Sequence, residues 1–231
     1  MSSNVRVIVS HPKLLLFLTG GKGEVMRKHA GIEVEKARTI YSRESDSSIV
    51  QLFNRFDRDL CVNYKGCFLY ALIRKAKPLV VIETGVASGV SSYSILQALE
   101  DNGKGALYSI DLPNASLPLP KGQSTGFLVP ERLRFRWTLK LGDSKSELPK
   151  ILDMVGTVDF FIHDSLHEYG HMMFEYQAAW PKLRKGGILF SDDVSFTDAF
   201  QDFCKANDIQ GTTVERKEAG FNIKLGWAEK P

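Results

Sequence analysis

From residue 79 onward, short apolar runs of strand length alternate with longer stretches in which apolar residues recur every three or four positions. The first pattern predicts buried strands at 79–84, 106–111, 134–141, 158–164 and 187–192. The second predicts helices at 91–102, 146–155, 168–183 and 196–205. Regular alternation of this kind is typical of an α/β domain whose mostly parallel sheet carries helices on both faces.

The two ends of the chain depart from this alternation. Near the C-terminus, predicted strands at 212–215 and 221–227 are separated by a connection that suits an antiparallel hairpin better than a crossover helix. Before residue 77, segments 47–60 and 66–75 have helical character. We therefore divide the chain into an N-terminal helical appendage or lid over residues 1–60 and an α/β domain over residues 61–231.

Composition and charge narrow the class of protein. Of 231 residues, 43% are hydrophobic and 25% are charged, which is ordinary for a globular protein, and no run reaches the ~18 apolar residues of a membrane helix. Three cysteines without a C-x-x-C spacing disfavour a disulfide framework and a structural zinc site, so we expect a cytoplasmic protein. The net charge of +3 is too mild to predict a nucleic-acid partner. Whether the chain forms homo-oligomers stays open.

One basic cluster lies in the predicted strand 134–141 and just before it. Its cations are interleaved with apolar residues, and period-2 alternation would place the two kinds on opposite faces of a strand. The favoured interpretation is a solvated strand face that discourages edge pairing, and the alternative is a surface for an anion or RNA. The cations are Arg132, Arg134, Arg136 and Lys140, and the apolar residues are Phe135, Trp137 and Leu139.

A glycine turn follows the first predicted strand of the α/β domain. It reads Glu83-x-Gly85-x-x-x-Gly89, which differs from the G-x-G-x-x-G fingerprint of a dinucleotide site. Glycines let the backbone approach a ligand closely, and the helix that opens at Ser91 offers amide donors to a carboxylate. The turn therefore predicts a nucleoside ligand without a pyrophosphate and disfavours a dehydrogenase.

Each predicted strand from 79 to 192 delivers an acidic residue to its carboxyl end, where open parallel sheets bind ligands. Asp111 has the two oxygens needed to accept from both ribose hydroxyls. Asp143, with the amide of Ser144, suits an adenine amino group. The alternative is that such acids cap the helices and turns that follow them.

A second group of acids is predicted at the fourth and fifth strands. Asp164, Asp192 and Asp193 should converge, and like charges raise one another's pKa unless a cation neutralises them. Mg²⁺ with oxygen ligands would do so; otherwise one acid caps a helix or contacts the nucleoside. His167 lies three residues after Asp164 and suits removal of a proton from a hydroxyl, unless it only packs at the start of a helix.

Together with the block Phe161–Tyr169, these motifs resemble class I S-adenosylmethionine-dependent methyltransferases. The likeness covers about residues 60–227 and is greatest to metal-dependent catechol-type and macrolide-sugar O-methyltransferases. It implies a Rossmann-like, doubly wound sheet of seven strands in the order 3-2-1-4-5-7-6, with strand seven antiparallel and residues 134–141 at an edge. It also implies S-adenosylmethionine as cofactor, held by Glu83, Gly85, Ala87, Ser88, Gly89, Ser91, Asp111, Asp143, Ser144 and Asp164.

The resemblance further implies a function. Asp164, Asp192 and Asp193 would hold Mg²⁺, with Asp164 and His167 as the catalytic residues. Catechol-type members carry a lysine where this chain has His167, whereas sugar-modifying members carry a histidine. We therefore expect O-methylation of a small-molecule acceptor, such as a sugar, a natural product or a catechol-like compound. The alternatives are a metal-independent methyltransferase with the same site and a non-catalytic protein that binds the cofactor.

Overall fold

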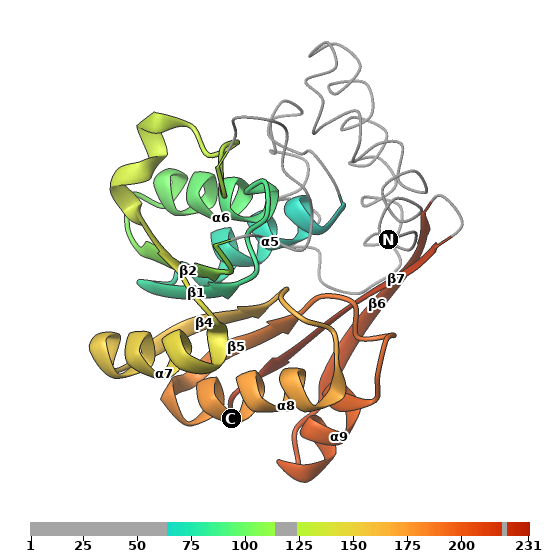
Figure 1. The fold of residues 1–231 in the computed structure, drawn as a ribbon. Helices are drawn as coiled ribbons and strands as arrows, with labels where there is room; N and C mark the ends of the chain where they lie inside the picture. The colour runs from blue at the N-terminus through green and yellow to red at the C-terminus, as the bar shows by residue number, and fades with distance from the viewer. Residues whose placement is uncertain (1–63, 114–123, 219–220) are drawn as a thin grey trace.

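The protein is described here by a computed structural model, which defines residues 64–113, 124–218 and 221–231. The predicted appendage at 1–60 lies outside these residues, as does most of the connection between residues 112 and 130. Element labels follow Figure 1. Within the described part, no helix is long and apolar enough to cross a membrane.

Seven strands of the described chain form one sheet, in the order β3-β2-β1-β4-β5-β7-β6. Strands β1 to β5 pair in parallel, whereas β7 runs antiparallel to both β5 and β6. The expected strand order, the antiparallel seventh strand and the edge position of β3 are therefore confirmed. The strands are β1 Val80–Thr84, β2 Ala106–Asp111, β3 Trp137–Leu141, β4 Val158–His163, β5 Leu183–Ser191, β6 Gly211–Glu218 and β7 Phe221–Glu229.

Helices cover both faces of this sheet, with α5 and α6 on one face and α7, α8 and α9 on the other (Figure 1). The α-helices are α5 Tyr64–Ala76, α6 Val90–Asp101, α7 Ser144–Val155, α8 Tyr169–Ala179 and α9 Ala199–Ala206; the 3₁₀ helices are η1 Glu131–Arg136 and η2 Trp180–Lys182. The helix predicted at 168–183 is too long, because α8 gives way to η2 at Trp180-Pro181. Proline lacks the amide that a continuing helix would need.

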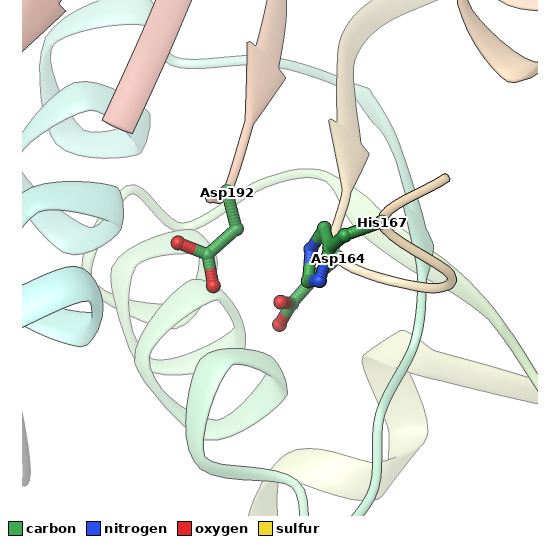
Figure 2. A group of neighbouring side chains, drawn as sticks. All are labelled: Asp164, His167 and Asp192. Atoms are coloured by element: carbon green, nitrogen blue, oxygen red, sulfur yellow. The ribbon is translucent and has the colours of Figure 1, made fainter. Parts of the chain in front are cut away.

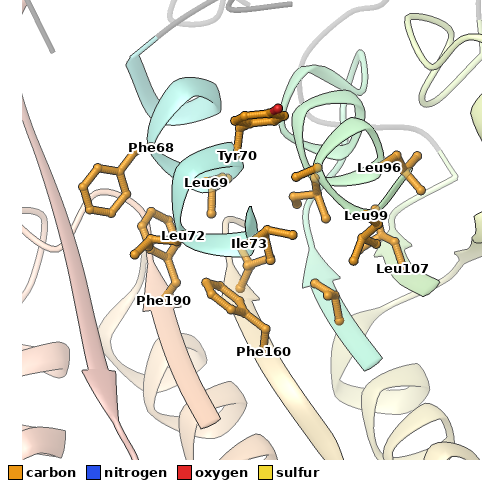
Figure 3. Close-up of a cluster of buried hydrophobic side chains, with 14 of the residues drawn as sticks. Phe68, Leu69, Tyr70, Leu72, Ile73, Leu96, Leu99, Leu107, Phe160 and Phe190 are labelled. Atoms are coloured by element: carbon orange, nitrogen blue, oxygen red, sulfur yellow. The ribbon is translucent and has the colours of Figure 1, made fainter. Parts of the chain in front are cut away.

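The sheet separates two apolar clusters, which explains the uninterrupted apolar runs of its central strands. Successive residues of one strand point to opposite faces. In β1, Val81 joins the cluster under α5 and α6, whereas Ile82 joins the cluster under α7 to α9. Phe160 and Phe161 of β4 divide in the same way. Figure 3 shows the first cluster, in which α5 and α6 pack on the sheet. A strand buried on both faces needs apolar side chains at every position.

The strand predicted at 134–141 is wrong in its first half. Residues 131–136 form η1, and the strand begins only at Trp137. Arg132 donates to Gln97 at 2.6 Å and Arg136 donates to Glu100 at 2.7 Å, so these cations are attached to α6. Phe135, expected on the apolar face, is 70% exposed. The alternation of cations and apolar residues therefore does not indicate a strand at residues 134–136. These residues belong to η1, which is bonded to α6 through Arg132 and Arg136.

The segment 124–130 folds back over the glycine turn. The amide of Gly126 donates to the carbonyl of Ala87 at 2.9 Å, and the amide of Leu128 donates to that of Ser88 at 3.0 Å. Gly126 has a φ of +72°, and a Cβ on it would lie 2.1 Å from Cη2 of Trp137. The segment can lie this close to Trp137 only because residue 126 has no side chain.

We predict that Gly126→Ala destabilises the protein by more than Gly103→Ala does. Both glycines have a positive φ, +72° and +70°, but nothing lies within 4 Å of a Cβ at Gly103. Gly103→Ala should therefore cost only about 1–2 kcal/mol for the left-handed backbone. Gly126→Ala should cost about 1–3 kcal/mol more, because Trp137 has to move. Urea unfolding measures both, and equal losses would show that Trp137 does not confine this segment.

Candidate active site

The glycine turn between β1 and α6 alternates in backbone conformation. Gly85, Ala87 and Gly89 have φ values of +84°, +47° and +92°. A Cβ on Gly85 would lie 2.0 Å from the carbonyl oxygen of Asp164, and one on Gly89 would lie 2.9 Å from the Cα of Gly126. The glycines are thus required both by the left-handed backbone and by neighbouring main chain. Their spacing brings the turn against the loop that follows β4.

Asp111, at the end of β2, holds the turn in place. Its Oδ2 accepts hydrogen bonds from the amides of Ala87 at 2.7 Å and Val86 at 3.2 Å, and its Oδ1 accepts from the amide of Leu112 at 2.8 Å. The carboxylate therefore serves the protein's own backbone in this arrangement. Its contact with a ribose stays a prediction, and would have to share or replace these bonds.

Glu83 lies behind the turn and is fully buried. It accepts hydrogen bonds from the hydroxyls of Ser91 at 2.5 Å, Ser92 at 2.6 Å and Ser109 at 2.8 Å. Burial raises the pKa of Glu83, against the opposing effect of the three hydroxyls. Glu83 connects β1 to β2 and to the first turn of α6. Glu83 and Ser91 therefore help to position the backbone of the turn at the predicted cofactor site. Their direct contact with a cofactor stays a prediction.

Asp143 and Ser144 begin α7 at the carboxyl end of β3. Oδ1 of Asp143 accepts from the amide of Lys145 at 2.9 Å and so caps the helix, as the alternative interpretation of the strand-end acids expects. Ser144 is buried and its hydroxyl lies 3.0 Å from Nε2 of His171. This pair therefore lies at the same end of the sheet as the glycine turn, and its contact with an adenine stays a prediction.

Asp164 and Asp192, here called the acid pair, follow β4 and β5. Their carboxylates face the same space beyond the strand ends, beside His167 (Figure 2). One ligand atom from each of these three residues lies within 4.8 Å of the others. Asp193, the third predicted metal ligand, is not in this group; its Oδ2 lies 3.9 Å from Nδ1 of His167. The structure thus brings together two of the three predicted acids and the predicted base.

Lys65 occupies the space between the two carboxylates. Its Nζ donates to Oδ2 of Asp164 at 2.6 Å and to Oδ2 of Asp192 at 2.5 Å. The side chain belongs to the first turn of α5, about 100 residues before the nearer acid in sequence, and is 19% exposed. Asp192 Oδ1 and His167 Nε2 are buried and have no hydrogen-bond partner among the described residues. The cluster therefore has an internal cation and two unused polar atoms.

The charges of this cluster shift one another. Burial raises the pKa of Asp164 well above its ordinary value, with Lys65 opposing the shift and Asp192 adding to it. Burial lowers the pKa of Lys65, but the two carboxylates raise it by more, so the side chain stays a cation. Burial and the charge of Asp192 raise the pKa of Asp193 to about 7. Burial lowers the pKa of His167 to about 4, so the imidazole is neutral at pH 7.

A buried polar network around Glu175 supports the site from the α8 side. Glu175 bonds to Thr84 at 2.5 Å, to His163 at 2.6 Å, and to Ser165 and His171 at 2.9 Å each. Burial raises the pKa of Glu175, but the bonds from His163 and His171 lower it by more. Because these partners lie at the ends of β1 and β4 and on α8, the network fixes the loop that carries Asp164 and His167.

Neither Lys65 nor Glu175 was predicted as a site residue. For Glu175, the available signal is its spacing of four residues from His171, which puts both on one face of a helix that is otherwise rich in apolar residues. Lys65 offers no such signal, because its partners lie 99 and 127 residues away in the sequence. Only the packing of α5 on the sheet shows where its side chain lies.

Comparisons with known proteins agree with this geometry. The family model described as a methyltransferase domain matches residues 82–194. Among curated proteins, no sequence matches the chain. The fold is similar to that of an O-methyltransferase from Bacillus cereus in complex with SAH, with 12% identity and a TM-score of 0.60 over 87% of this chain and 100% of that chain.

Two further solved structures share the fold. The O-methyltransferase TomG from Streptomyces achromogenes, in complex with SAM, is 16% identical, with a TM-score of 0.57 over 86% of this chain and 89% of that chain. An SAH-bound methyltransferase from Podospora anserina is 14% identical, with a TM-score of 0.54 over 85% and 96%. The expected Rossmann-like methyltransferase fold is therefore confirmed.

We predict that Glu83→Ala lowers both stability and affinity for an adenosyl ligand. The change leaves three buried serine hydroxyls without their acceptor, at a cost of about 2–4 kcal/mol. Glu131→Ala is the matched control, because the Glu131 side chain is 92% exposed and should change little. Urea unfolding and calorimetric binding of S-adenosylhomocysteine measure the two effects. Unchanged binding in a folded Glu83→Ala protein would contradict the orienting role.

Proposed function

We propose that the chain, whose residues 82–194 match a methyltransferase-domain model, is a class I methyltransferase that moves the methyl group of S-adenosylmethionine to a hydroxyl oxygen of a small molecule. The observation that carries the proposal is the convergence of the glycine turn, the acid pair and His167 at one end of the sheet. Open α/β sheets bind their ligands at this end. S-adenosylmethionine bound at the turn would lie beside the loop that carries Asp164, so we place its sulfonium toward the acid pair.

The cofactor half of the proposal is supported by the backbone of the turn. A carbonyl oxygen of the loop after β4 lies 2.0 Å from where a Gly85 side chain would begin, so the cofactor-binding turn and the acid-bearing loop are adjacent. The solved neighbours from Bacillus cereus and Streptomyces achromogenes carry SAH and SAM. We therefore assign S-adenosylmethionine as the methyl donor of this chain.

Methyl transfer requires the protein mainly to align the acceptor oxygen with the sulfonium methyl group and to remove the hydroxyl proton. The acceptor oxygen attacks the sulfonium methyl carbon, a C–O bond forms as the C–S bond breaks, and the electron pair goes to sulfur to give S-adenosylhomocysteine. The hydroxyl proton passes to the imidazole of His167, which is neutral and has a buried nitrogen without a partner among the described residues. Asp193, whose Oδ2 lies 3.9 Å from Nδ1 of that ring, would in its ionised form stabilise the imidazolium.

Exposed apolar side chains beside His167 favour an acceptor with an apolar portion. Phe196 is 66% exposed and its ring centroid lies 5.6 Å from that of His167. Leu166, the neighbour of His167 in sequence, is 50% exposed. Large apolar groups exposed next to a polar cluster are typical of ligand sites. The acceptor class that fits is a hydroxylated small molecule whose ring or chain packs on Phe196.

The metal expected from the sequence competes with Lys65. A divalent cation between the two carboxylates would compete with the Lys65 ammonium, which binds Oδ2 of both at 2.6 and 2.5 Å. With Lys65 in place, these residues do not fit a metal, and the proposed transfer uses none. Metal-assisted transfer is the second candidate, favoured by the grouping of Asp164, His167 and Asp192 within 4.8 Å, and it requires Lys65 to move away.

We expect the full chain to bind S-adenosylhomocysteine and not a nicotinamide dinucleotide. The turn has the spacing Gly85-x-x-x-Gly89 and lacks the glycine spacing that accommodates a pyrophosphate. Isothermal titration calorimetry with each ligand distinguishes the two. Binding of the dinucleotide with no response to S-adenosylhomocysteine would overturn the assignment of the cofactor, and with it the proposed reaction.

His167→Ala should abolish most methyl transfer while cofactor affinity persists. Loss of a general base costs about 10²–10⁴-fold in rate. Transfer of radiolabelled methyl from S-adenosylmethionine to a panel of catechols, flavonoids and sugars gives the rate, and calorimetry gives the affinity. Glu168→Gln, one residue away and exposed, is the control that should retain the rate. If both variants transfer equally well, His167 has no part in the reaction.

A further inference from the structure

The position of Lys65 suggests more than a structural ion pair. Its ammonium lies between two carboxylates at the ends of β4 and β5, and the side chains of the three residues are 19%, 15% and 9% exposed. A surface ion pair contributes little, whereas charges that are buried together interact strongly. His167 belongs to the same group of side chains, and we place the proposed acceptor hydroxyl beside it.

Helix α5 holds Lys65 rigidly in this place. Phe68 and Leu69, three and four residues further along, share its face of the helix and are fully buried. The Phe68 ring packs on Phe190 of β5 at 5.9 Å and on Trp227 of β7 at 5.0 Å. The first turn of α5 is thus anchored to the strand that carries Asp192. Lys65 cannot leave the acid pair by moving the helix without breaking this packing.

The Lys65 ammonium offsets part of the charge of the two carboxylates. Without Lys65, two buried carboxylates would face each other with no opposing charge, a costly arrangement. With it, Oδ2 of each acid is bonded, and the buried Oδ1 of Asp192 has no partner among the described residues. That oxygen and the unpartnered nitrogen of His167 belong to the same group of neighbouring side chains, beside which we place the acceptor hydroxyl.

We propose that the Lys65 ammonium is the resident cation of this site, held by Asp164 and Asp192 where a divalent metal would otherwise bind. The inference rests on the proposed function for its catalytic role. As the acceptor hydroxyl loses its proton to His167 and attacks the methyl carbon, the fixed positive charge of Lys65 stabilises the negative charge that builds up on the oxygen. Methyl transfer then proceeds without a metal, and a metal can enter only if Lys65 is removed.

The first measurement is metal binding, which does not depend on activity. The full chain is titrated with Mn²⁺ and the free ion is followed by electron paramagnetic resonance. We expect no binding at millimolar Mn²⁺ by the unmodified protein, and binding of one ion by Lys65→Ala, lost again in Lys65→Ala/Asp192→Asn. Lys75→Ala, an exposed position on the same helix, should behave as the unmodified protein. Mn²⁺ binding by the unmodified protein, or none by a folded Lys65→Ala, would overturn the proposal.

The second measurement is turnover. Transfer by the unmodified protein should survive exhaustive treatment with EDTA and gain nothing from Mg²⁺. Lys65→Met should lower kcat by about 100-fold or more with the S-adenosylhomocysteine affinity nearly unchanged, because a fixed charge acts mainly in the transition state. Loss of transfer on chelation, or full kcat in Lys65→Met, would overturn the catalytic role. If no acceptor is methylated at all, the proposed function fails, while the Mn²⁺ titration still decides whether Lys65 takes the place of the metal.

Discussion

Burial of several carboxylates at one end of a parallel sheet is the constraint around which this structure is built. Strands β1, β2, β4 and β5 each have an acid at or next to their carboxyl end, and a buried carboxylate is costly unless charge or hydrogen bonds compensate it. Each acid has a different partner: serine hydroxyls for Glu83, backbone amides for Asp111 and an ammonium for the acid pair. Many of the groups around the site are the hydrogen-bond donors and the cation that compensate these carboxylates.

These partners also link the elements of the domain. The three serines on Glu83 belong to α6 and β2, so the acid joins the turn to two neighbours. Glu175 joins α8 to the ends of β1 and β4 through Thr84 and His163. Lys65 joins α5 to β4 and β5. A site assembled in this way is rigid before any ligand arrives, which favours alignment of donor and acceptor.

The negative charge of the acid pair can be offset by either of two kinds of cation, a metal ion or an ammonium. Two carboxylates and an imidazole within 4.8 Å could hold a metal ion, whereas an ammonium at the same place supplies one positive charge. The chemistry available differs: a metal can bind the acceptor directly, whereas an ammonium offers charge and hydrogen bonds. The source of the cation therefore matters more for mechanism than the acids themselves.

Local sequence determined most of the fold. Uninterrupted apolar runs such as Val80-Val81-Ile82 identify strands buried on both faces, and the glycines at 85 and 89 identify the turn, because those positions need a left-handed backbone. Period-2 alternation was the only signal for a strand at residues 134–136, and there the prediction was wrong, because these residues belong to η1, whose Arg132 and Arg136 bond to α6. The strand-end acids could be predicted because parallel strands share one carboxyl edge. Their partners could not, because Lys65 and Glu175 reach the site through the packing of helices distant in sequence, and only the tertiary structure decides which cation faces the acid pair.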